Sequence, residues 1–165
     1  MRFPQVPLGS LVCAIVWMSA STPSYCAPKE SGTMQAHGDF DVKITPQRAD
    51  NPDAEAAGFA RIALDKRYHG AIEGSGRGEM LAAGDGSKSG AYVALEKVSG
   101  TLDGREGSFA LLHSAVMVDG VPRDWSIRVV PDSGTGQLTG IEGRLRITMA
   151  AGKHSYDLEY TLPTD

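Results

Sequence analysis

The sequence predicts an all-β protein, an antiparallel up-and-down β-barrel of about eight strands. Apolar and polar residues alternate along most of the chain after residue 33, which is typical of strands that bury one face. Turn-forming residues recur roughly every ten positions, and we identify no helix in this region. Twenty glycines and 7% aromatic residues favour tight turns over a helical bundle.

The first 26 residues resemble a secretory signal peptide. Arg2 precedes an apolar run from Leu8 to Ala20, and small residues follow. This run is shorter than the roughly 20 residues that span a bilayer, so we predict cleavage and no membrane span. The cut lies between Ser24 and Ala27, most simply after Cys26, and the large Tyr25 disfavours lipidation of that cysteine. The expected location is periplasmic or secreted.

Composition limits the rest of the chain to one domain without disulfides. Residues 27–33 are predicted to form a flexible lead-in and residues 34–163 a single β-barrel domain. Cys13 and Cys26 both precede this domain, so its stability must come from its core. The net charge of −4 disfavours nucleic acid as a partner, because phosphate binding needs a concentrated basic face.

The first strand is expected from Met34 to Ile44, where even-numbered residues are apolar, and Pro46 should end it. Residues 47–58 hold many turn formers and predict a loop that could cover one mouth of the barrel. A second strand, long or broken, should run from Phe59 to Ile72. Bulges or sharp corners of the sheet are then expected at four closely spaced glycines, Gly70, Gly74, Gly76 and Gly78.

The central element is a β-hairpin from Tyr92 to Met117, with Asp103-Gly104 as its turn. Both central residues of a type I′ turn need positive φ, which aspartate and glycine tolerate. The turn therefore fixes which residues face each other across the two strands. The expected pairs are Leu102 with Arg105, Val98 with Phe109, Glu96 with Leu111, Ala94 with His113, and Tyr92 with Ala115.

This register places a carboxylate, an imidazole and a phenol on one largely apolar face. Glu96 and His113 lie diagonally, roughly 7–8 Å apart between backbones, which long side chains can bridge. With Tyr92 on the same face and Tyr156 from the last strand, these four are the candidate ligand-binding residues. The alternative is a structural hydrogen-bond network, because barrel interiors also contain satisfied polar groups.

The opposite face of the hairpin is also apolar. Its apolar residues include Ala91, Val93, Leu95, Leu112 and Val116. Strands that are apolar on both faces need cover on both faces. We therefore expect this surface to join copies of the chain in a homo-oligomer.

The remaining strands follow from alternation and turn residues. They are expected over Glu79–Ala83, Trp125–Val130, Leu138–Met149 and His154–Leu162. Residues 84–90 and 131–137 should be loops, and Asp119-Gly120 and Ala151-Gly152 should be turns. No metal site or cofactor is predicted, because His37, Asp39 and Asp41 fit an outward polar face, and the glycine-rich segment 74–78 lacks the lysine of a phosphate loop.

Six short segments are similar to a known bacterial family. They are Met34–Gly38, Gly78–Leu81, Ala91–Ala94, Gly107–Phe109, Val129–Gly136 and Gly152–Tyr156. On these the chain resembles the family catalogued as domain of unknown function 3224, from Met34 to Leu162. The resemblance implies a barrel like that of allene oxide cyclase and dirigent proteins, with eight antiparallel strands around a cavity, and it implies no established activity. The export segment departs from the usual member and argues against a cytoplasmic role.

Three functions fit these observations. The preferred one is a barrel that binds a small apolar molecule in its lumen, because an eight-stranded barrel can hold one small ligand. The second is an isomerase or cyclase in which Glu96 or His113 moves a proton. The third is an oligomeric structural protein of the envelope. The sequence does not decide whether the protein is an enzyme.

Overall fold

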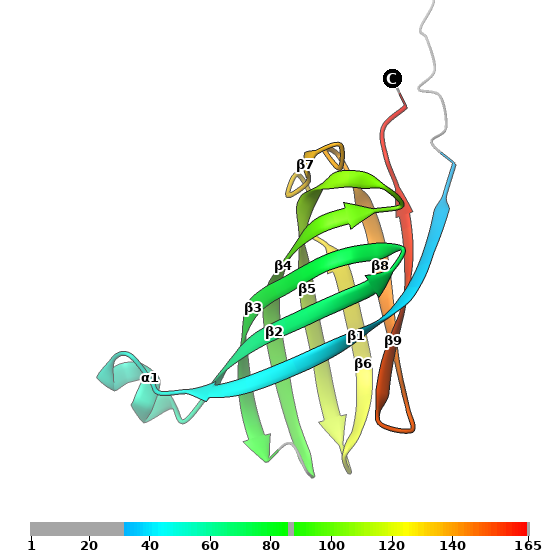
Figure 1. The fold of residues 1–165 in the computed structure, drawn as a ribbon. Helices are drawn as coiled ribbons and strands as arrows, with labels where there is room; N and C mark the ends of the chain where they lie inside the picture. Colours follow the sequence, from blue (N-terminus) through cyan, green and yellow to red (C-terminus); the bar gives the residue numbers. More distant parts are fainter. Residues whose placement is uncertain (1–31, 86–87, 165) are drawn as a thin grey trace, which may run out of the picture.

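A computed structural model describes residues 32–85 and 88–164, in which eight long strands form a closed antiparallel barrel (Figure 1). The strands are β1 (Met34–Gln47), β2 (Ala60–Gly70), β3 (Ile72–Asp85), β4 (Ser89–Leu102), β5 (Arg105–Val118), β6 (Val121–Val129), the two-residue β7 (Thr135–Gly136), β8 (Glu142–Ala150) and β9 (Lys153–Thr161). Long strands that follow each other along the chain pair, and β1 pairs with β9 to close the barrel. The predicted all-β, eight-stranded barrel is confirmed, whereas the predicted signal peptide and most of the lead-in lie outside the described residues.

The turn at Asp103-Gly104 and the register it fixes are confirmed. Both residues have positive φ, 49° and 78°, as a type I′ turn requires. All five cross-strand pairs expected for the hairpin occur between β4 and β5. The same left-handed pair joins β5 to β6 at Asp119-Gly120 and β8 to β9 at Ala151-Gly152.

The loop prediction for residues 47–58 is wrong, because a short helix, α1 (Pro52–Ala57), lies within them. The Asn51 side chain caps its first turn by accepting a hydrogen bond from the Ala54 amide at 2.7 Å. Gly58, with φ 68°, ends it. Figure 1 shows α1 beyond the far end of β1, away from the barrel mouths, so it does not cover one.

Strand β1 continues through Pro46, where the sequence analysis ended it. Its pairing with β9 stops at Phe40, whereas its pairing with β2 continues to Gln47. The last part of β1 therefore has a free edge, where a proline is tolerated because its missing N–H has no partner to lose.

Strand β3 pairs with β2 and β4 without a register shift, so the bulges expected at Gly74, Gly76 and Gly78 are absent. Gly70, with φ 101°, does lie at a sharp corner, between the end of β2 and the start of β3. The register shift lies on the other side of the barrel. Ser114 pairs with Ser126 and Val116 with Arg123, so two residues of β6 oppose one of β5. The two residues of β6 in this bulge are Asp124 and Trp125, and Asp124 has a positive φ of 49°. Such a bulge re-aims side chains, and here both Pro122 before it and Trp125 within it point into the lumen.

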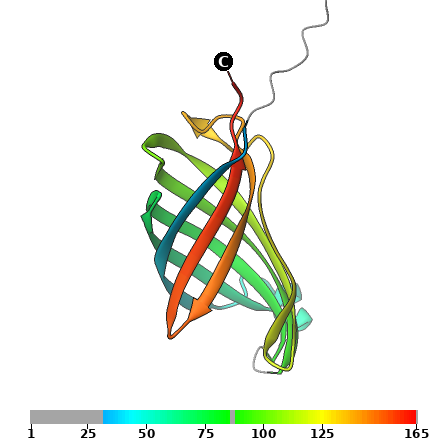
Figure 2. The same cartoon turned by 90° about the vertical axis from the view of Figure 1, so that its right-hand side faces the viewer.

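The barrel is packed at one end and hollow at the other. Buried side chains fill the end near the termini. The loop between β6 and β8 folds over this end (Figures 1 and 2). This loop explains a second correction: Leu138 and Ile141, predicted to begin a strand, instead form a turn with 1% of each residue exposed. The other large, fully buried side chains include Tyr68, Ile72, Leu102, Phe109, Leu111, Tyr156, Leu158 and Tyr160.

Candidate functional site

Four polar side chains meet inside the barrel. Lys66 and Tyr68 come from β2, Glu96 from β4 and His113 from β5. Lys66 Nζ lies 2.7 Å from Glu96 Oε2, and the Tyr68 hydroxyl donates to Glu96 Oε1 at 2.9 Å. His113 Nε2 is 3.1 Å from Glu96 Oε2. The predicted proximity of Glu96 and His113 is therefore observed, with Glu96 at the centre of the cluster.

This cluster is deeply buried and has space because β3 lacks side chains beside it. Lys66 is 6% exposed, Glu96 1% and His113 4%. A Cβ added at Gly76 would overlap Oε1 of Glu96 and crowd the Tyr68 ring. Buried charges persist when they are paired and hydrogen-bonded, so the inward-facing glycine and the ion pair depend on each other.

The electrostatics of the cluster favour an ionised Glu96. Burial acts to raise its pKa, but the contacts and charges of His113 and Lys66 outweigh burial, so the pKa of Glu96 lies below its ordinary value. Burial, reinforced by the Glu96 charge, raises the pKa of Tyr68 well above 10.0. The phenol thus stays protonated and can donate to the carboxylate.

Aromatic rings surround the ammonium of Lys66. Its Nζ lies 4.7 Å from the centroid of the Phe40 ring, within the range of a cation–π interaction. The ring of His154 in turn stacks on the Phe40 ring, with centroids 5.1 Å apart. The cluster therefore has a hydrophobic and aromatic side that faces the open end of the barrel.

A hollow of about 240 Å3 occupies this open end. Its lining is mainly apolar, and among the residues that the structure describes it includes no Asp or Glu. The lining residues are Phe40, Val42, Leu64, Lys66, Met80, Tyr92, Ala94, His113, Met117, Pro122, Trp125, Ile147, Met149 and His154. Two of the four predicted site residues, Tyr92 and His113, thus line the hollow.

The other two predicted site residues lie deeper. Glu96 contacts the hollow only through Lys66 and His113, which lie against it. The Tyr156 hydroxyl accepts a hydrogen bond from the Ile72 amide at 2.7 Å. Its ring packs edge-on against Tyr68 with centroids 5.5 Å apart. The structure therefore brings Glu96 and His113 together and places Tyr156 among packed core residues.

Sequence reasoning missed Lys66 and Tyr68. A usable sign existed, because Lys66 shares the alternation phase of Ile62 and Leu64, which marks it as inward-facing. A lysine on an apolar strand face needs a buried carboxylate, and Glu96 was the available one.

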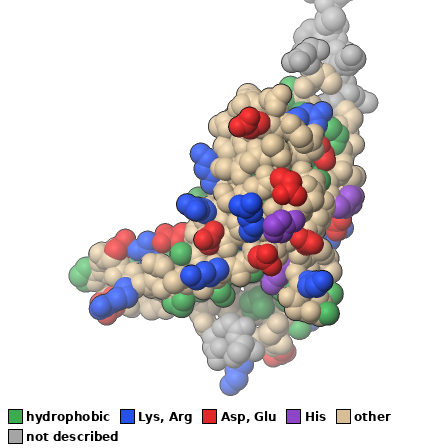
Figure 3. Space-filling model, in the orientation of Figure 1, with side chains coloured by type: hydrophobic (Ala, Val, Ile, Leu, Met, Phe, Trp, Pro, Cys, Tyr) green, Lys and Arg blue, Asp and Glu red, His purple; other side chains and the backbone are tan. Residues whose placement is uncertain are grey.

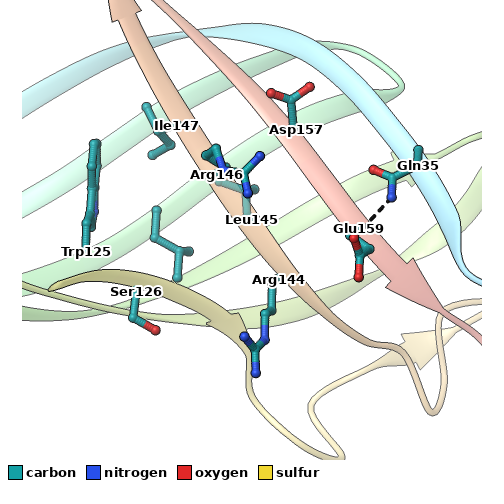
Figure 4. A pocket seen from close by; sticks show the side chains of 10 residues that line it. Gln35, Trp125, Ser126, Arg144, Leu145, Arg146, Ile147, Asp157 and Glu159 are labelled. Carbon is teal, nitrogen blue, oxygen red and sulfur yellow. Dashed lines mark hydrogen bonds between the residues drawn. The ribbon is translucent and has the colours of Figure 1, made fainter.

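A cleft lies between β6 and β8, the two neighbouring long strands with the fewest backbone pairs in the described barrel. These strands share one backbone pair, Arg128 with Arg144. A cleft of about 430 Å3 lies there, with Trp125 and Ile147 on one side (Figure 4). The same two side chains also line the hollow, so they separate the two spaces.

The outside of the barrel carries side chains of both charges on the face that Figure 3 shows. Arg61 on β2 forms ion pairs with Asp50, in the segment before α1, and with Glu79 on β3. Across residues 32–85 and 88–164, no group of three or more His, Cys, Asp or Glu could hold a metal ion. Within the same ranges, no helix has the length and apolar character that a membrane span requires.

The outer face of β3, β4 and β5 is apolar and exposed. Exposed large side chains there include Leu81 (45%), Val93 (52%), Leu95 (59%), Leu112 (45%) and Val116 (44%). The sequence analysis expected four of these on this face. They lie on the outside of the single chain, uncovered by its other described residues.

Comparison with known proteins places these features in a family. The model of the family described as Protein of unknown function (DUF3224) matches residues 36–160. A crystal structure of a protein with unknown function from the DUF3224 family of Shewanella oneidensis MR-1 is 39% identical, with a TM-score of 0.71. That similarity covers 81% of this chain and 100% of that chain. No curated protein matches the sequence.

Proposed function

The chain belongs to the DUF3224 family of proteins of unknown function, and from its site we propose that it binds a small, mainly apolar molecule in the open end of the barrel. The observation that supports this most directly is the hollow of about 240 Å3 with a largely apolar lining. Ligand sites in proteins are concave and mostly apolar, with a few polar groups that orient the ligand.

The size of the hollow limits the ligand. An apolar protein cavity of about 150 Å3 holds benzene, and the hollow here is about 240 Å3. A molecule with a single ring or a short branched chain therefore fits. A sterol or a long acyl chain does not fit without movement of the lining residues.

The buried cluster supports binding more directly than catalysis by Glu96. The Glu96 side chain is 0% exposed, and it does not line the hollow. A general base must come within about 3 Å of the proton that it removes. An isomerase or cyclase mechanism would therefore have to use His113 or Lys66, with Glu96 positioning them.

Filling the hollow tests the proposal. Ala94 is buried and lines the hollow on β4, so Ala94→Phe puts a ring into that space. Thr148→Phe is the matched control, because Thr148 is exposed on β8 between Ile147 and Met149, which both line the hollow. The measurements are native mass spectrometry of the purified protein and titration with ethylbenzene followed by NMR.

We expect the wild type and Thr148→Phe to retain a co-purified small molecule or to bind ethylbenzene. Ala94→Phe should do neither while remaining folded by circular dichroism. A wild type that carries no small molecule and shows no saturable ethylbenzene binding would refute the proposal.

A further inference from the structure

The polar groups that line the hollow share one property. The ammonium of Lys66, the hydroxyl of Tyr92, the indole of Trp125 and the rings of His113 and His154 can all donate a hydrogen bond. Carboxylates, which only accept when ionised, are absent from the described lining residues. The hollow is therefore suited to a ligand that accepts hydrogen bonds.

Two of these donors make no well-formed hydrogen bond within the described part of the protein. Among the described residues, the buried side-chain nitrogens without a hydrogen-bond partner are His113 Nε2 and Trp125 Nε1. Each nitrogen has a polar neighbour: Glu96 Oε2 is 3.1 Å from His113 Nε2, and the Tyr92 hydroxyl lies close to the Trp125 indole, but neither contact meets the geometry of a hydrogen bond. Native proteins satisfy most buried polar atoms, so each unsatisfied one calls for an explanation.

The two unpartnered nitrogens belong to neighbouring parts of the lining. His113 on β5 pairs with Ile127 on β6, two residues after Trp125. Trp125, two residues before the buried Ile127, faces the lumen near the small Ala115, which pairs with Tyr92 on its other side. One molecule in the hollow can therefore contact both rings once they turn their N–H groups toward it.

The charge of the cluster indicates a neutral acceptor. The Lys66 ammonium is paired one-to-one with the Glu96 carboxylate at 2.7 Å, so no positive charge remains uncompensated. The Glu96 carboxylate also lies 3.1 Å from His113 Nε2. It would repel the carboxylate of a charged ligand that approached His113.

We infer that the ligand is a neutral carbonyl compound, a small ketone, ester or enone whose oxygen accepts hydrogen bonds from His113 Nε2 and Trp125 Nε1. This inference rests on the proposed binding function and adds the chemical class of the ligand. The apolar body of the molecule lies against Val42, Leu64, Met80 and Met117.

Three probes of similar size test the inference at about pH 8. They are acetophenone, which has a ring and a carbonyl, ethylbenzene, which lacks the oxygen, and benzoate, which is charged. We expect acetophenone to bind roughly tenfold more tightly than ethylbenzene, as two ordinary net hydrogen bonds predict. Benzoate should bind more weakly than acetophenone.

The Trp125 indole N–H provides a direct readout. The full chain has a second tryptophan, Trp17, so a Trp17→Phe background assigns the indole NMR signal. Acetophenone should move this signal downfield, whereas ethylbenzene should not. Trp125→Phe keeps a ring but removes the donor, so it should weaken acetophenone binding several-fold and leave ethylbenzene binding within about twofold.

The failures of the two proposals are distinguishable. A wild type that carries no co-purified small molecule and binds neither ethylbenzene nor acetophenone overturns the binding function itself. Equal affinities for ethylbenzene and acetophenone, tighter binding of benzoate, or an unchanged preference in Trp125→Phe overturns the carbonyl assignment while binding stands. Retained ethylbenzene binding in Trp125→Phe shows that the hollow of the variant is intact.

Discussion

Glu96→Gln is the substitution with the largest expected effect on stability. The variant keeps the shape of the side chain but leaves the Lys66 ammonium, 6% exposed, without its carboxylate. Removing one partner of a buried ion pair costs about 3–5 kcal/mol, a large part of the roughly 5–15 kcal/mol that stabilises a typical domain. Replacing both partners, in Lys66→Met with Glu96→Gln, should restore stability to within about 1 kcal/mol of wild type.

The outside of the barrel provides a control at the same distance. Arg61 Nη2 and Glu79 Oε1 are also 2.7 Å apart, but the Glu79 side chain is 50% exposed. Exposed ion pairs contribute about 0–1 kcal/mol, so Glu79→Gln should change the free energy of unfolding by no more than that. Urea unfolding of wild type, the single variants and the double variant measures all of these values.

The stability contributed by ionised Glu96 should depend on pH and decrease in acid. The pKa of Glu96 lies below its ordinary 4.5 in the folded protein, because His113 and Lys66 outweigh the effect of burial. Its contribution is therefore present above pH 4.5 and is lost as the pH falls through the lowered pKa. The gap in stability between wild type and Glu96→Gln should narrow in acid. A loss below about 1 kcal/mol at neutral pH, or additive single effects in the double variant, would refute the reasoning.

Two further substitutions test the interior. Gly76→Ala should lower the free energy of unfolding by about 1–3 kcal/mol, because the added Cβ would overlap Glu96. The control Gly32→Ala, whose Cβ would have nothing within 4 Å, should change it by less than about 0.5 kcal/mol in urea unfolding. Equal effects of the two substitutions would contradict the close packing of Gly76 against Glu96. Burial and the hydrogen bond to Asp103 raise the pKa of Tyr160 to about 12, so wild-type stability should fall as pH rises from 10 toward 12. Tyr160→Phe should show a shallower decline over this range, and parallel curves would argue against that assignment.

Local sequence rules predicted most of the fold. The alternation of apolar residues and the Asp103-Gly104 turn are short-range features, so they fixed the strand type and the hairpin register. The helix α1 was missed because six residues are too few to show helical periodicity. The bulge at Asp124 was missed because nothing in its immediate sequence marks a positive φ.

The site was only partly predictable, because its members come from strands far apart in the chain. Glu96 and His113 share one hairpin, so their proximity followed from its register. Lys66 is 30 residues before Glu96, and their contact depends on two further strand pairings across β3. The predicted export segment and homo-oligomer stay predictions, the first because residues 1–26 lie outside the described part of the chain.

The two ends of the barrel differ in packing, and this difference determines where a small molecule could enter. Tyr156, Tyr160 and Leu102 fill the end near the termini, while the space beside Met117 and Met149 is open. The barrel is therefore closed by packed side chains at one end and open only at the other. A ligand bound as proposed would therefore enter and leave through the open end, beside Met117 and Met149.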